Sequence, residues 1–463
     1  MGLFEKLGYN KPISAGAGSV NYFKILFYSV WLAGSVAFFL PAQAETFLKF
    51  PEGFLWGTAT AAYQVEGGIE NDWSAAGLDA GKAAEHYEHY EEDFDDLEQM
   101  GTQIYRLSLE WARLEPEPGK YDLKALTHYR EMLQSLNRRG IQPMVTVFHF
   151  TLPPWFVAKG GWTKEENIAD FVRFTHWISA ELKDEVNWWF TLNEPLVYAF
   201  KGYDAGQWPP FVKNRNLALR VIKHLILAHG QAYRAIHAED PIAWVSFAKN
   251  ISLLEPNWPA NPLDQAMTGF QSYLFNETFW EAISKGELSF SVPGIEPIVI
   301  PPNADLKGSL DFIAFNYYTR YLIAADGSQK TRQGVPVTEL NWEIYPEGML
   351  KVLRMANQHA QKMKIPIFIS ENGLADGDDS QRPAYLVRHM AQIWQGIQEG
   401  IPVRGYLHWT LMDNYEWADG YAAKFGLMDI ERNWRPSAWL FQDMIQQNGF
   451  PAQWLEKYKL PER

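Results

Sequence analysis

The fold is decided by a short apolar run that ends in polar residues, Trp188-Trp189-Phe190-Thr191-Leu192-Asn193-Glu194-Pro195. Apolar side chains on consecutive positions are typical of a strand that is buried on both faces, as in a parallel sheet. A carboxylate directly after such a strand is costly to bury unless it is paired or its pKa is shifted. The stretch therefore predicts both a parallel β architecture and a polar site at the end of a strand.

Similar apolar runs recur along the chain, and longer amphipathic stretches separate them. The amphipathic stretches include 122–139, which opens on Asp122 and stops at Gly140, and 214–237. Eight strands that alternate with helices predict an α/β fold, a single (β/α)8 TIM barrel. A doubly wound sheet would need a glycine-rich phosphate turn after the first strand, and residues 57–60 do not supply one. The eight predicted strands are residues 54–61, 104–110, 143–150, 188–194, 244–248, 312–319, 367–371 and 403–412.

The composition excludes several classes of protein. A net charge of −14 in 463 residues gives no basic excess for binding phosphate backbones, so no nucleic acid partner is expected. The absence of cysteine excludes disulfides, thiolate metal sites and a cysteine nucleophile. A hydrophobic fraction of 47% supports a large core, and an aromatic fraction of 15% suits the binding of sugar rings.

The first 44 residues differ from the rest of the chain. Residues 25–40 carry no charge, Lys24 precedes them, and Pro41-Ala42-Gln43-Ala44 resembles a site of signal cleavage. We expect 1–44 to be a cleaved export signal, with an uncleaved membrane anchor as the alternative and a buried core helix as the least favoured interpretation. The catalytic domain would then span 45–463, the N-terminal segment would contact a membrane at least transiently, and the protein would be exported (periplasmic or extracytoplasmic) or membrane-anchored.

Polar residues gather at the carboxyl ends of the predicted strands, where barrel proteins carry their functional sites. Two of these residues are Glu194 and Glu371, each of which ends an apolar run. Paired carboxylates on either side of a reacting centre are the apparatus of glycoside hydrolysis. The alternative is that each glutamate only forms an ion pair at the barrel rim, for example with Arg106.

Several motifs resemble family 1 glycoside hydrolases, the retaining β-glucosidases and β-galactosidases. Residues 191–195 and 369–373 are similar to the two signatures of that family, and 54–67, 311–319 and 404–417 to its first, sixth and eighth strands. The likeness begins near residue 50, extends to the C-terminal region, and is closest to the archaeal β-glycosidases. It implies hydrolysis of terminal β-D-glucosyl, galactosyl or fucosyl residues through a covalent glycosyl-enzyme, with a β-linked saccharide or glycoside as partner and with no cofactor and no metal.

The same resemblance assigns roles to residues. It implies that Glu194 is the general acid/base and Glu371 the nucleophile, held ionised by Arg106, with carboxyl groups roughly 5–5.5 Å apart. Desolvation and the second carboxylate would raise the pKa of Glu194. A carboxylate at Glu416 would repel a phosphate, which predicts a sugar without a 6-phosphate. The implied substrate-binding residues are Gln64, His149, Asn193, Tyr318, Trp409, Glu416 and Trp417, and the supporting residues are Arg106 and Asn316.

Several alternatives stay open at this point. The leader, together with residues 152–155, 160–162 and 413–420, also resembles the membrane-anchored galactolipid galactosyltransferase branch, so transfer of a sugar between glycolipids by the same two glutamates is the second candidate. His149 is followed by Phe150 where many family members have tryptophan, which leaves the glycon open, and loops around Trp258, Trp280 and Trp342 would set the aglycone. The acidic run 85–98 could bind a metal, although a solvated helix face is favoured. A catalytically inactive sugar-binding protein is disfavoured because both glutamates are present.

Overall fold

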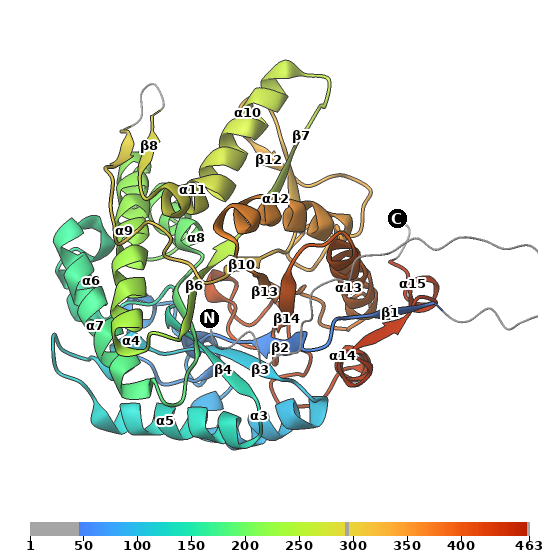
Figure 1. The fold of residues 1–463 in the computed structure, drawn as a ribbon, viewed down its shortest axis with the longest axis horizontal. Helices are drawn as coiled ribbons and strands as arrows, with labels where there is room; N and C mark the ends of the chain where they lie inside the picture. The colour runs from blue at the N-terminus through green and yellow to red at the C-terminus, as the bar shows by residue number, and fades with distance from the viewer. Residues whose placement is uncertain (1–45, 292–295, 461–463) are drawn as a thin grey trace, which may run out of the picture. The chain divides into compact units, whose positions relative to one another are not determined.

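Eight parallel strands close into a barrel in the computed structural model of the chain, which describes residues 46–291 and 296–460 (Figure 1). The strands follow one another around the barrel in the order β10-β13-β14-β2-β3-β4-β5-β6. The predicted TIM barrel is confirmed. Its strands are β2 (Leu55–Ala59), β3 (Ile104–Ser108), β4 (Gln142–Phe148), β5 (Trp188–Asn193), β6 (Trp244–Asn250), β10 (Ile313–Asn316), β13 (Ile367–Asn372) and β14 (Val403–Trp409).

A helix follows each barrel strand and packs outside the barrel (Figure 1). The two helices predicted at 122–139 and 214–237 are present as α5 and α9. The Asp122 side chain accepts hydrogen bonds from the backbone of Lys124 and Ala125, and Asn214 caps α9 in the same manner. The outer helices are α3 (His86–Met100), α5 (Leu123–Arg138), α7 (Ile168–Leu182), α9 (Arg215–Glu239), α11 (Thr278–Lys285), α12 (Glu347–Met363), α13 (Arg382–Gln398) and α14 (Pro436–Gln447).

Shorter elements occupy the loops. A three-stranded sheet of order β12-β11-β7 and an antiparallel pair, β8 with β9, extend the loops after β6 and β10. These elements are β7 (Leu253–Pro256), β8 (Leu288–Phe290), β9 (Ile298–Ile300), β11 (Arg320–Ile323) and β12 (Gln329–Lys330). The short helices are α1 (Ala62–Val65), α2 (Asp72–Ala75), α4 (Trp111–Leu114), α6 (Pro154–Ala158), α8 (Pro195–Ala199), α10 (Pro262–Ser272) and α15 (Trp454–Lys457), with π-helical turns at Phe200–Asp204 and Tyr273–Glu277.

The predicted strands are too long at several carboxyl ends. The strand predicted at 143–150 ends at Phe148, and the strand predicted at 188–194 ends at Asn193. The cause is a change of backbone direction, since Phe150 and Glu194 have φ of 72° and 41°. Extended strands cannot contain such residues. Phe150 and Glu194 thus lie outside the strands, at the carboxyl ends where the sequence predicts the candidate site.

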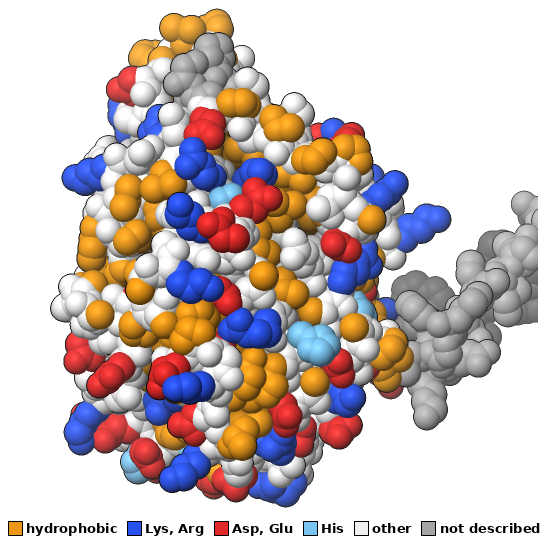
Figure 2. Space-filling view, turned by 90° about the vertical axis from the view of Figure 1, so that its left-hand side faces the viewer, with side chains coloured by type: hydrophobic (Ala, Val, Ile, Leu, Met, Phe, Trp, Pro, Cys, Tyr) orange, Lys and Arg blue, Asp and Glu red, His pale blue; other side chains and the backbone are white. Residues whose placement is uncertain are grey.

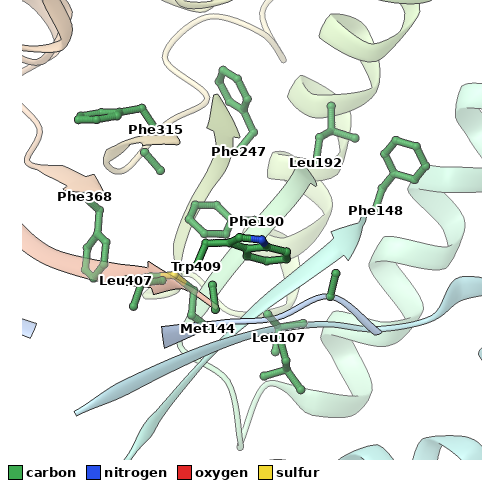
Figure 3. Close-up of a cluster of buried hydrophobic side chains, with 14 of the residues drawn as sticks. Leu107, Met144, Phe148, Phe190, Leu192, Phe247, Phe315, Phe368, Leu407 and Trp409 are labelled. Carbon is green, nitrogen blue, oxygen red and sulfur yellow. The ribbon is translucent and has the colours of Figure 1, made fainter. Parts of the chain in front are cut away.

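The barrel strands are buried on both faces (Figure 3). Inside the barrel, Phe190 lies 4.7 Å from the Arg106 guanidinium. On the outer side, Phe247 packs against Phe279 of α11, with ring centroids 4.3 Å apart. Burial on both faces explains why the strands read as nearly continuous apolar runs.

The acidic run forms α3, and the expectation of a wholly solvated face is wrong at two positions. His86 and Asp93 are buried and hydrogen-bonded to each other, 2.6 Å apart, and Arg432 donates to Asp93 at 2.7 Å. The run therefore anchors the C-terminal region to α3. Over residues 46–291 and 296–460 there is no group of three or more His, Asp or Glu side chains placed to hold a metal ion.

The predicted leader at 1–44 lies outside the described residues, so the export signal and the domain boundary stay predictions. Within 46–291 and 296–460, no helix combines the length and the apolar character needed to cross a membrane.

Asn448 joins the two ends of the described domain. Strand β1 (Phe47–Lys49) pairs with β15 (Gly449–Pro451), and Asn448 precedes β15 with φ of 48°. Its amide donates to the carbonyl oxygens of Phe50 and Pro51 at 3.0 and 3.1 Å, and its Oδ1 accepts from Trp56 Nε1 at 2.9 Å. These bonds hold the entrance to β2 against α14.

The variant Asn448→Ala should lower the free energy of unfolding by about 3 kcal/mol, because alanine tolerates positive φ poorly and three hydrogen bonds are lost. Urea denaturation followed by tryptophan fluorescence measures this change. Asn448→Gly relieves the backbone and loses only the bonds, so it should be about 1 kcal/mol less destabilised than the alanine variant. An alanine variant as stable as the wild type would show that these bonds do not support the fold.

Candidate active site

A cavity of about 630 Å³ opens where the carboxyl ends of the barrel strands meet. Eight of the eleven residues singled out in the sequence line it: His149, Asn193, Glu194, Tyr318, Glu371, Trp409, Glu416 and Trp417. The other three, Gln64, Arg106 and Asn316, stand behind the wall, and each is hydrogen-bonded to a lining residue.

Glu371 lies at the end of β13 with both carboxylate oxygens engaged. Arg106 Nη1 donates to Oε1 at 2.5 Å, and the Tyr318 hydroxyl donates to Oε2 at 2.5 Å. Arg106 is completely buried and also donates to Asn193 Oδ1 at 2.7 Å and to Thr146 Oγ1 at 3.1 Å. The guanidinium therefore fixes the carboxylate from the interior of the barrel.

Glu194 lies directly after β5 and is held by amides. Its Oε1 accepts from Asn316 Nδ2 at 2.7 Å and from Asn250 Nδ2 at 3.0 Å. Its positive φ begins the turn into α8. The two glutamates share one cavity, yet Glu371 has a cationic partner and Glu194 has neutral ones.

Burial raises the pKa of both carboxyl groups. The pKa of Glu371 rises to about 7, since burial outweighs the lowering by Arg106 and is reinforced by Glu194. The pKa of Glu194 is also raised by burial, and Asn316 and Asn250 oppose that rise. We expected Arg106 to keep Glu371 fully ionised, but a single buried guanidinium offsets only part of the desolvation.

The environments of the two groups decide which of them carries a shared proton. A proton on Glu371 would leave the buried Arg106 guanidinium without the carboxylate it pairs with, which is strongly unfavourable. The amide partners of Glu194 also favour its ionised form, but two neutral donors do so less strongly than the paired guanidinium does for Glu371. We therefore expect a proton shared by the pair at neutral pH to reside on Glu194.

The polar end of the cavity is built around Glu416. Its Oε2 accepts from Gln64 Nε2 at 3.0 Å, and burial raises the pKa of Glu416 to about 8. His149 Nε2 accepts from the Asn193 amide at 2.9 Å, so the His149 proton lies on Nδ1, and burial lowers the pKa of His149. Among the described residues, Gln64 Oε1 and His149 Nδ1 have no hydrogen-bond partner. These two atoms can still bond ligand hydroxyls.

Aromatic rings form the wall beside these polar groups. The Trp417 ring lies 5.8 Å from His149 and 4.8 Å from Trp73, and the Trp409 ring lies 6.1 Å from His149. Phe150 packs 5.0 Å from Trp417 and takes part in the same wall. Flat apolar faces beside buried hydroxyl partners suit the binding of a sugar ring.

Sequence reasoning missed two residues at the end of β6. Asn250 bonds Glu194, and the neighbouring Lys249 is buried, with its pKa lowered to about 7 by burial. The predicted strand stopped at 248, two positions before the polar end. Of the three tryptophans expected at the aglycone loops, Trp342 lines the cavity, whereas Trp280 is buried in α11 and Trp258 is exposed outside it.

Comparisons with known proteins identify the family of the chain. The family model for glycosyl hydrolase family 1 matches residues 47–450. Beta-glucosidase A of Thermotoga maritima is 30% identical over 442 residues, covering 87% of this chain and 98% of that protein. A beta-galactosidase of Saccharolobus solfataricus is 31% identical over 484 residues, covering 87% and 96%. The solved structure of a beta-glycosidase from Pyrococcus horikoshii superposes with a TM-score of 0.81 at 33% identity, over 90% of this chain and 99% of that one.

The match extends over nearly all of the barrel, and the paired glutamates at the ends of β5 and β13 lie within it. The chain therefore belongs to glycosyl hydrolase family 1 and is an O-glycosyl hydrolase of the β-glycosidase type.

Proposed function

We propose that the protein is a retaining β-glycosidase that releases β-D-glucosyl, galactosyl or fucosyl residues from the non-reducing end of its substrates. The observation that carries this proposal is the contrast between the two glutamates. Glu371 is anchored by a buried cation and Glu194 by amides, within one cavity. This contrast supplies an ionised nucleophile and a protonated acid at the same pH.

In the first step, Glu371 attacks the anomeric carbon while Glu194 gives its proton to the glycosidic oxygen, and the aglycone leaves as an alcohol. Glu371 loses its charge as the glycosyl ester forms. The repulsion between the two carboxylates then disappears, so Glu194 stays ionised and can take a proton from water. Attack of that water on the anomeric carbon releases the sugar and restores Glu371. Two inversions at one carbon retain its configuration.

The polar end of the cavity is the proposed glycon site, with Gln64, His149, Asn193 and Glu416 as hydroxyl partners and Trp409 as an apolar floor. The beta-glucosidase of Thermotoga maritima has been solved in complex with glucoimidazole and with galacto-hydroximolactam, which supports a site that takes either configuration. The Glu416 carboxyl group repels a phosphate whenever it is ionised, which its pKa of about 8 places above neutral pH, so we propose a sugar without a 6-phosphate.

Transfer to a second glycolipid is the alternative, because the same two glutamates serve it. An acceptor hydroxyl would replace water in the second step, with Glu194 again taking the proton. Apolar residues beside Glu194, including Val197 and Phe275, leave room for a glycolipid on the leaving-group side. The predicted leader would place either activity outside the cytoplasm or at a membrane, and this location is likewise a proposal.

Proton NMR of the first product tests the proposal. With aryl β-glucoside, β-galactoside and β-fucoside as substrates, the β anomer should appear before mutarotation, and the aryl β-glucoside 6-phosphate should not be cleaved. Water and a galactolipid acceptor, offered together, separate hydrolysis from transfer. Initial release of the α anomer would rule out double displacement and would predict carboxyl groups roughly 6.5–9.5 Å apart.

The variant Glu194→Gln separates acid catalysis from nucleophilic attack. For ethyl β-glucoside, whose leaving group needs a proton, kcat/KM should fall about 10²–10⁴-fold. For dinitrophenyl β-glucoside, whose leaving group does not, kcat/KM should change far less.

The pH profile of the same variant gives a second readout. In the wild type, activity rises with pH as Glu371 ionises and falls as Glu194 loses its proton, so only the falling limb should vanish in Glu194→Gln. Glu117→Gln, an exposed glutamate remote from the cavity, serves as the matched control. Equal losses on both substrates would contradict the assignment of Glu194.

A further inference from the structure

Lys249 is a buried lysine that the mechanism above does not use. It lies in β6 and is 1% exposed. Figure 2 shows Lys and Arg side chains on the surface beside Asp and Glu, where water and neighbouring carboxylates stabilise their charge. Among the residues that the structure describes, no carboxylate forms an ion pair with Lys249, and its Nζ donates to the carbonyl oxygen of Asn250. An apolar side chain would therefore be easier to bury at this position.

The two neighbours of Lys249 in β6 both hold Glu194. Glu194 N donates to the Ala248 carbonyl oxygen at 2.8 Å, and Asn250 Nδ2 donates to Glu194 Oε1 at 3.0 Å. Successive side chains of a strand point to opposite faces, so Asn250 faces the cavity and Lys249 lies on the outer face of the barrel, as Phe247 does. The lysine thus stands directly behind the residues that fix Glu194.

The surroundings of the ammonium keep water away from it. Its Nζ lies 4.4 Å from the centre of the Phe275 ring, which belongs to the π-helical turn Tyr273–Glu277. Phe275 lines the active-site cavity, whereas Lys249 lies behind that wall. An aromatic face attracts a cation, and a charge acts more strongly where water does not screen it. The charge of Lys249 therefore reaches its neighbours through protein.

Two carboxylates act on this ammonium, Glu194 after β5 and Glu277 in the π-helical turn. Burial lowers the pKa of Lys249 to about 7, and both carboxylates oppose that change. Burial raises the pKa of Glu194, its amide partners lower it, and Lys249 is the first charged group that lowers it, ahead of Arg106. Glu277 also bonds His359 Nε2 of α12, 2.5 Å away. The described strands β5 and β10, which flank β6, carry no charged residue of their own.

We propose that Lys249 is a positioning residue for acid catalysis, whose buried ammonium stabilises the carboxylate that Glu194 becomes when it gives its proton to the glycosidic oxygen. This inference rests on the proposed function and deepens it. Lys249 keeps its own protons throughout, since the proton of Glu194 passes to the leaving group while Glu371 bonds the anomeric carbon. Before the step the charged glutamate is Glu371, beside Arg106. After the step it is Glu194, beside Lys249.

The variant Lys249→Met tests the proposal, because methionine is of similar length and uncharged. With ethyl β-glucoside, whose leaving group needs a proton, kcat/KM should fall about tenfold. With dinitrophenyl β-glucoside it should be nearly unchanged. The falling limb of the pH profile with ethyl β-glucoside should move to higher pH, because Glu194 holds its proton more tightly without the cation. Lys124→Met, which removes an exposed charge from α5, is the matched control and should keep the wild-type profile.

A purely structural role of Lys249 would give a different pattern. Equal losses on both substrates, with the falling limb unmoved or at lower pH, would overturn the proposal. In a Glu194→Gln background there is no carboxylate to stabilise, so Lys249→Met should cause no further loss with ethyl β-glucoside, and a further tenfold loss would also contradict the proposal. Equal losses on both substrates in Glu194→Gln alone would instead overturn the proposed function.

A second variant, Glu277→Gln, reaches the same ammonium without altering β6. Loss of the Glu277 charge makes Lys249 give up its proton at lower pH, so the falling limb should move as in Lys249→Met, but by less. Glutamine can still bond His359 through its amide oxygen. If Lys249→Met does not fold, Glu277→Gln decides the question, and a wild-type pH profile in that variant would overturn the proposal.

Discussion

The ion pair between Arg106 and Glu371 is the interaction on which the active site depends. Arg106 is completely buried inside the barrel and bonds residues of β4, β5 and β13 at once, through Thr146, Asn193 and Glu371. A buried charge that loses its partner costs several kcal/mol, so these strands must keep their register for the pair to survive. Asn193 in turn orients His149, and Tyr318 completes the bonding of Glu371. The glycon side of the cavity is thereby tied to the interior of the barrel.

On the proposed mechanism, the same pair explains how two like residues acquire opposite roles. Burial alone would raise the pKa of both glutamates and would not distinguish them. The difference comes from their partners, since the guanidinium favours the charged form of Glu371 more strongly than the neutral amides favour the charged form of Glu194. The barrel makes this possible because parallel strands bring residues from distant parts of the chain to one rim. The proposed difference between the two glutamates therefore depends on the residues that hydrogen-bond to them, and not on the glutamates themselves.

Much of the fold and of the site can be predicted from the sequence. Apolar runs identify all eight barrel strands because burial on both faces leaves few polar positions, and polar residues at their ends mark the cavity. The exact strand ends cannot be predicted from the sequence. At Glu194, for example, the strand ends because the backbone adopts a positive φ, and glutamate is not a residue type that favours positive φ. Asn250 was missed because the predicted strand stopped at 248. Contact of Gln64 with the sugar stays a prediction, since its Nε2 donates to Glu416 and its Oε1 has no hydrogen-bond partner among the described residues.

The proposed mechanism requires Glu371 to become covalently bonded to the sugar. Incubation with dinitrophenyl 2-deoxy-2-fluoro-β-glucoside, whose fluorine slows the second step more than the first, allows this intermediate to accumulate. Mass spectrometry of the intact protein and of its peptides should then find one fluoroglucosyl group, located on Glu371, in the wild type and none in Glu371→Gln. A wild-type protein that releases dinitrophenol from this substrate over repeated turnovers without a glycosyl group on Glu371, or that carries the group on another residue, would contradict the account.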